Sequence, residues 1–137
     1  MRALDPLLAL AEARVPSGLR RTLIVFGTAP LALAGLRPGV RDLDLFASEG
    51  DFSALVAAGH PLDAARPEAP IVRLGEGVEV YRTWAGVSFA AVDAAAREQP
   101  GSRGFRVASL AHVLAYKVAA GRPKDADDVA LLRRVLG

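Results

Sequence analysis

Two aspartates separated by one leucine are the residues of this chain best suited to chemistry. They lie in the segment Asp42-Leu43-Asp44-Leu45. Residues two apart in a β-strand point to the same side, so both carboxylates would share one face while Leu43 and Leu45 pack inward. Two neighbouring negative charges repel unless a cation lies between them, and carboxylate oxygens suit Mg²⁺. We therefore expect Asp42 and Asp44 to bind Mg²⁺; the alternative is an ordinary strand with one solvated face.

A glycine and a hydroxyl residue precede this pair. The apolar run Leu23–Phe26 ends at Gly27-Thr28, thirteen residues before Asp42. A glycine at a strand-to-helix turn allows close approach of the backbone to a ligand, and the start of a helix offers free N–H groups to an anion. Thr28 adds a hydroxyl donor. We expect Gly27 and Thr28 to bind phosphate, and the alternative is a tight turn with a capping threonine.

Two further polar residues complete the candidate site, and a third is expected to have a different role. Glu79 lies between Val78 and Val80 and could orient or deprotonate an attacking hydroxyl, or be a surface glutamate. Lys117 falls late in an apolar helical segment, from which it would extend to solvent or reach a triphosphate. Asp125 is expected to cap the last helix rather than to bind a ligand.

The elements that must position these residues follow from hydrophobic periodicity and turn residues. Gly75-Glu76-Gly77 separates two apolar runs and predicts a β-hairpin. Strands interspersed with helices predict an α/β (α+β) fold, with a small mixed β-sheet flanked by helices. Helices are expected over residues 3–14, 28–36, 52–58, 88–98, 109–120 and from 125 onward, and strands over 22–26, 42–47, 71–74, 78–82 and 105–108.

Composition limits the class of protein. The length of 137 residues suits one domain, residues 1–137, and no apolar run approaches the roughly 18 residues of a membrane span. The absence of cysteine excludes disulfides and thiolate zinc sites and is compatible with a reducing cytoplasm. Arginine supplies fifteen of the seventeen basic residues, which favours a polyanionic partner such as nucleotide or RNA or simply reflects codon composition.

The motif itself resembles a known family. Phe26-Gly27-Thr28, thirteen residues and then Asp42-Leu43-Asp44-Leu45 is similar to the motif of the nucleotidyltransferase (polymerase-β-like) superfamily. Lys117 and the run Arg122-Pro123-Lys124-Asp125 with Asp128 resemble the end of minimal bacterial members, including toxins of abortive-infection and toxin–antitoxin systems. These segments cover well under half of the chain.

The resemblance implies a role for each candidate residue. Gly27 and Thr28 would bind the triphosphate, and Asp42 and Asp44 would hold Mg²⁺. Glu79 would take the place of the third carboxylate, and Lys117 would contact phosphate. Thr28 replaces the usual Ser or Gly, the spacer has the maximum usual length, and Glu79 replaces the commoner Asp.

Three functions compete on this basis. The first is Mg²⁺-dependent transfer of a nucleoside monophosphate from an NTP to a hydroxyl on RNA, protein or a small molecule. The second is a non-catalytic relative that binds nucleotide or acts in a toxin–antitoxin pair with an antitoxin partner. The third is an Arg-rich nucleic-acid-binding module. Paired aspartates favour the first, because they would repel a polyanion in the absence of metal.

Overall fold

The fold is built on one mixed β-sheet of seven strands in the order β3-β4-β5-β2-β1-β7-β6. The structure is a computed structural model that describes all residues, 1–137. The central strand β2 pairs antiparallel with β1 and parallel with β5, and β1 pairs parallel with β7. The strands are β1 (Ile24–Phe26), β2 (Leu43–Phe46), β3 (Leu62–Asp63), β4 (Ile71–Gly75), β5 (Val78–Tyr81), β6 (Arg97–Glu98) and β7 (Arg106–Val107).

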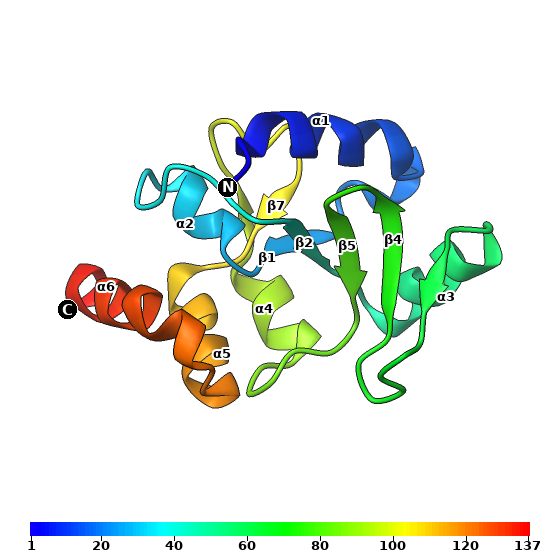
Figure 1. Cartoon of the computed structure of the whole chain (residues 1–137). Helices are drawn as coiled ribbons and strands as arrows, with labels where there is room; N and C mark the ends of the chain where they lie inside the picture. The colour runs from blue at the N-terminus through cyan, green and yellow to red at the C-terminus, as the bar shows by residue number, and fades with distance from the viewer.

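Six α-helices and two 3₁₀ turns surround this sheet (Figure 1). Ser48, Ser88 and Ser109 each accept a hydrogen bond from a backbone N–H of the helix that follows, as N-cap serines do. The α-helices are α1 (Leu4–Arg14), α2 (Ala29–Leu33), α3 (Glu49–Ala57), α4 (Phe89–Ala95), α5 (Leu110–Ala120) and α6 (Ala126–Leu136), and the 3₁₀ turns are η1 (Ser17–Leu19) and η2 (Pro123–Asp125).

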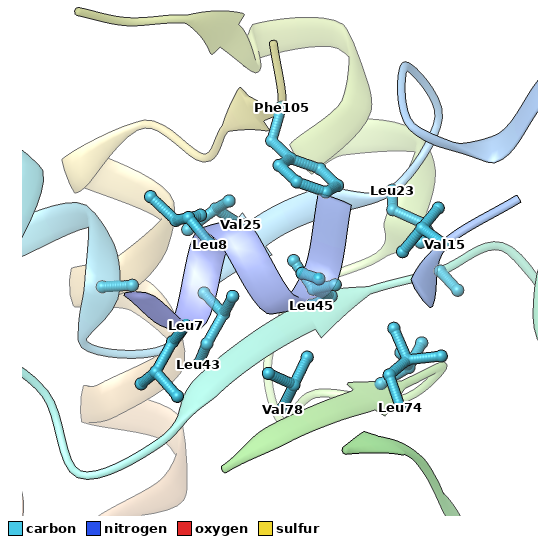
Figure 2. Close-up of a cluster of buried hydrophobic side chains, with 14 of the residues drawn as sticks. Leu7, Leu8, Val15, Leu23, Val25, Leu43, Leu45, Leu74, Val78 and Phe105 are labelled. Carbon is cyan, nitrogen blue, oxygen red and sulfur yellow. The ribbon is translucent and has the colours of Figure 1, made fainter. Parts of the chain in front are cut away.

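Alternation along the strands gives the sheet two different faces. Val25, Leu43, Leu45 and Val78 are fully buried on the first face, where Figure 2 shows them clustered with Leu7 and Leu8 of α1. Strand residues between them pack on the second face, which α4, α5 and α6 partly cover. The second-face cluster comprises Ile24, Phe26, Leu31, Phe46, Val92, Ala96, Ala108, Val113, Tyr116 and Leu132.

This alternation determines where the acidic residues lie. Because Leu43 and Leu45 face α1, Asp44 between them must point to the second face. The same holds for Glu79, which separates the buried Val78 and Val80. In Figure 1, α4 lies below β1, while α5 and α6 lie to the lower left below α2, on the side away from β4. On the second face, Asp44 of β2 and Glu79 and Tyr81 of β5 line a cavity, whereas Phe46 of β2 is buried in the second-face cluster.

The expected α+β class is confirmed, with a mixed sheet flanked by helices. Helix α3 begins at Glu49 rather than at Phe52, because Ser48 caps it and Glu49 and Asp51 supply negative charge in its first turn. Helix α2 is five residues long and shorter than expected, and the chain leaves it at Gly35, whose φ is +76°. No helix has the length and apolar character needed to cross a membrane.

Candidate functional site

All six candidate residues line one cavity of about 840 Å³ on the second face of the sheet. Strands β2 and β5 supply two of its acidic residues. The segment from α5 through η2 to α6 lines it as well, and so does the loop between β3 and β4. The candidate residues that meet here are Gly27, Thr28, Asp42, Asp44, Glu79 and Lys117.

Sheet register brings the acidic residues together. Asp44 is the parallel partner of Glu79 on β5 and the antiparallel partner of Phe26 on β1. Asp42 immediately precedes β2, and both aspartates line the cavity. The expectation that both carboxylates share one side of the sheet, with Leu43 and Leu45 buried on the other, agrees with this arrangement.

Gly27 is required by its contact with Asp44. Its φ is +64°, a backbone conformation that residues with a Cβ rarely adopt. A Cβ atom placed on Gly27 would lie 2.7 Å from Oδ2 of Asp44, closer than the two atoms can approach without movement. The turn after β1 therefore packs its backbone directly against the carboxylate. With only five residues in α2, we attribute little anion binding to the helix itself.

We expect Gly27→Ala to lower the free energy of unfolding by about 2–4 kcal/mol, because it combines a left-handed backbone with a clash. Gly35→Ala is the matched control. Gly35 has φ +76° and a Cβ added there would meet no atom within 4 Å, so this substitution should cost only about 1 kcal/mol. Chemical denaturation measures both. Equal losses of unfolding free energy in the two variants would show that the clash between the added Cβ and Asp44 does not destabilise the fold.

Asp44 is the acidic residue whose ionisation the cavity changes most. Burial, together with the negative charges of Glu79 and Asp42, raises its pKa from 3.8 to about 7 against the opposing effects of Lys117 and Arg122. The negative charge of ionised Asp44 is thus not fully offset by the cations near it. Carboxylate oxygens with uncompensated charge suit a hard divalent cation such as Mg²⁺, so the donor set fits the metal expected from the sequence.

Glu79 is held by two neighbours. The guanidinium of Arg73 donates to Glu79 Oε2 and also to Asp63 Oδ2 at 3.1 Å, while the Tyr81 hydroxyl donates to Glu79 Oε1 at 3.0 Å. Both oxygens of Glu79 are therefore engaged within the protein. No three acidic, histidine or cysteine side chains gather closely enough to enclose a metal ion by themselves.

Lys117 does not extend to solvent, because its side chain is only 1% exposed. Its ammonium donates to Thr28 Oγ1 at 3.2 Å and to Asp125 Oδ1 at 3.0 Å, and lies 3.3 Å from Asp128 Oδ2. One lysine thus joins the Gly-Thr turn to α5, η2 and α6.

The expectation that Asp125 caps the last helix is wrong. Asp125 occupies the N-cap position of α6 but makes no side-chain cap hydrogen bond, and its backbone has the helical angles φ −95° and ψ 0°. Its carboxylate accepts instead from Lys117 and, at 2.8 Å, from Arg122 Nε. Burial by itself would raise the pKa of Asp125, but the hydrogen bonds and charges of Lys117 and Arg122 outweigh it and leave that pKa lowered.

Two arginines that bind acidic residues of the site, without lining the cavity themselves, were missed from the sequence. Arg37 donates from Nε to Asp128 Oδ1 at 2.7 Å, although the two residues are 91 positions apart in the sequence. No local sequence pattern predicts a contact between residues so far apart. The contact of Arg73 with Glu79 could have been predicted from the sequence, because the expected hairpin places the two residues opposite each other.

Aromatic and basic residues are also among those that line the cavity. Trp84 lies with its ring centre 4.7 Å from those of both Tyr81 and Tyr116, and its indole Nε1 is buried without a hydrogen-bond partner. Three exposed cations, which we call the basic rim, line the cavity and form no ion pair: Arg41, Arg66 and Lys124. Acidic residues and unpaired cations thus line the same cavity.

Neither the comparison with protein-family models nor the search of curated proteins finds a match to this chain.

Proposed function

We propose that the protein is a Mg²⁺-dependent nucleotidyltransferase of the polymerase-β-like type. It would transfer a nucleoside monophosphate from an NTP to a hydroxyl acceptor on RNA, protein or a small molecule and release pyrophosphate. The observation that carries this proposal is that the Gly27-Thr28 turn, the Asp42–Asp44 pair and Lys117 line one cavity although they are far apart in the sequence. The α+β architecture is compatible with the fold that this activity implies.

Each part of the cavity suits one part of the substrate. Asp42 and Asp44 would hold Mg²⁺, and a bound Mg²⁺ would neutralise part of the negative charge of the phosphates. Gly27 lets the turn pack against Asp44, which would bring a phosphate at the turn close to the metal, and Thr28 offers it a hydroxyl. The basic rim would attract the polyphosphate or a polyanionic acceptor by charge. Positioning and charge neutralisation are what phosphoryl and nucleotidyl transfer chiefly require.

The test is transfer of label from α-³²P-labelled NTPs, each offered separately with Mg²⁺, to total RNA or to cell lysate. We expect wild-type protein to label an acceptor, and Asp42→Asn and Asp44→Asn to reduce the labelling at least ~100-fold, because each removes a metal-binding charge. Asp127→Asn is the matched control, since Asp127 is exposed on α6 and does not line the cavity. Equal labelling by all four proteins would exclude the assignment of Asp42 and Asp44.

A non-catalytic nucleotide-binding protein, including one half of a toxin–antitoxin pair, is the second candidate. The specific observation in its favour is that Arg73 and Tyr81 occupy both oxygens of Glu79, the proposed third carboxylate. Under this alternative, NTPs raise the melting temperature in a Mg²⁺-dependent manner, yet no acceptor becomes labelled. Thermal shift with ATP, CTP, GTP and UTP, with and without Mg²⁺, therefore separates the two candidates when combined with the transfer assay.

A further inference from the structure

The ammonium of Lys117 is already surrounded by acceptors within the protein. An ammonium has three N–H donors and no acceptor. Here one donor goes to Thr28 Oγ1 and one to Asp125 Oδ1, and Asp128 Oδ2 is the third close oxygen. The lysine would have to leave one of these oxygens to contact a ligand.

The surroundings oppose such a movement. The side chains of Asp125 and Asp128 are only 6% and 12% exposed, so each would be left as a buried charge with less compensation. Arg122 and Arg37 hold the far sides of these two carboxylates. Lys117 is therefore fixed in place.

The position of Lys117 decides what the Thr28 hydroxyl can do. Since Lys117 can only donate, Thr28 Oγ1 must accept from it, and the hydroxyl hydrogen must point elsewhere. Thr28 occupies the N-cap position of α2 without making a side-chain cap hydrogen bond, and no other protein acceptor receives its hydrogen. Thr28 also lines the cavity. A hydroxyl that accepts from a cation becomes a stronger donor through its own O–H group.

We propose that Lys117 is a positioning residue that acts on a bound polyphosphate through Thr28, without touching the ligand itself. It holds the Thr28 hydroxyl so that the hydrogen is donated to a phosphate oxygen in the cavity. The inference rests on the proposed function in one respect, the choice of a polyphosphate as ligand. It replaces the expectation from the sequence that Lys117 contacts phosphate directly.

The first test measures binding of Mg²⁺-tripolyphosphate by isothermal titration calorimetry. Thr28→Ser keeps the hydroxyl and should bind within about threefold of wild type, whereas Thr28→Val should bind about 10- to 100-fold more weakly, as loss of a hydrogen bond to a charged group predicts. Thr22→Val, outside the cavity, is the control. Thr28→Val with wild-type affinity would overturn the proposal, as would failure of the wild-type protein to bind the anion.

The second test asks whether the bound anion affects Lys117 only through the hydroxyl of Thr28. The chain has two lysines, Lys117 and Lys124, so their ¹H–¹³C ε-methylene signals can be resolved after selective labelling. At matched occupancy, Mg²⁺-tripolyphosphate should shift the Lys117 signal in wild type and Thr28→Ser and leave it unmoved in Thr28→Val. An equal shift in Thr28→Val would mean that Lys117 contacts the anion directly and would overturn the proposal.

Failure of this inference can be told apart from failure of the proposed function. Thr28-dependent anion binding without any NTP transfer would remove the catalytic proposal and support the inference. NTP transfer with an unchanged KM in Thr28→Val would support the catalytic proposal and overturn the inference.

Discussion

Replacing Lys117 with methionine is expected to lower the free energy of unfolding by about 3–5 kcal/mol, the usual cost of removing one partner from a buried ionic network. The methionine keeps most of the apolar volume but leaves Asp125 and Asp128, both largely buried, without their shared cation. Arg122 and Arg37 remain and prevent a larger loss. Urea or guanidinium denaturation at pH 7 measures the difference.

Lys124→Met is the matched control, because the same substitution is made at an exposed lysine without an ion pair. Its effect should stay within about 0.5 kcal/mol. If the two methionine variants unfold at the same denaturant concentration, the buried ion pairs do not stabilise the fold. The role of Lys117 would then be confined to ligand binding in the cavity.

Asp44→Asn is expected to affect stability and function in opposite directions. In Mg²⁺-free buffer at pH 8 it should raise the free energy of unfolding by about 2 kcal/mol. The shift of the Asp44 pKa from 3.8 to about 7 sets an upper limit of roughly 4 kcal/mol on this gain in the free energy of unfolding. The cost of burying the polar amide of the new asparagine offsets part of the gain. The same variant should lose Mg²⁺-dependent stabilisation by NTP. Thermal unfolding with and without Mg²⁺ measures both effects, with Asp127→Asn as control.

The pH dependence of stability gives an independent check on Asp44. Because its folded-state pKa is raised, the native state binds this proton more tightly than the unfolded state between pH 3.8 and about 7. The contribution of Asp44 therefore falls as pH rises through this window and is constant above it. Wild type in EDTA should show this decline, and Asp44→Asn should show a smaller one. Identical profiles for the two proteins would contradict the raised pKa.

The sequence predicted the central part of the site because its geometry is local. Alternation within Asp42–Leu45 places the buried leucines opposite the acidic side, and an apolar run ending at Gly27-Thr28 marks the end of a strand. The hairpin around Gly75-Glu76-Gly77 likewise places Glu79 on a strand, between the buried Val78 and Val80. These features depend only on neighbouring residues, so a single sequence suffices.

The rest depends on contacts between distant segments. A capping role for Asp125 was a sound local interpretation, but tertiary structure brings Lys117 and Arg122 to its carboxylate. The two-residue strands β3 and β6 were not expected, since so short a segment has too few residues to show alternation. The ion pair of Arg37 with Asp128 also arises only after folding.

The aromatic lining of the cavity gives the protein a built-in optical reporter. Trp84 is the single tryptophan of the chain, and it lies in the cavity wall between Tyr81 and Tyr116. Excitation at the red edge of the indole band therefore yields emission from one position only, with no background from other indoles. Titrations of cation, anion or nucleotide can be followed on unlabelled wild-type protein by the intensity and wavelength of that emission.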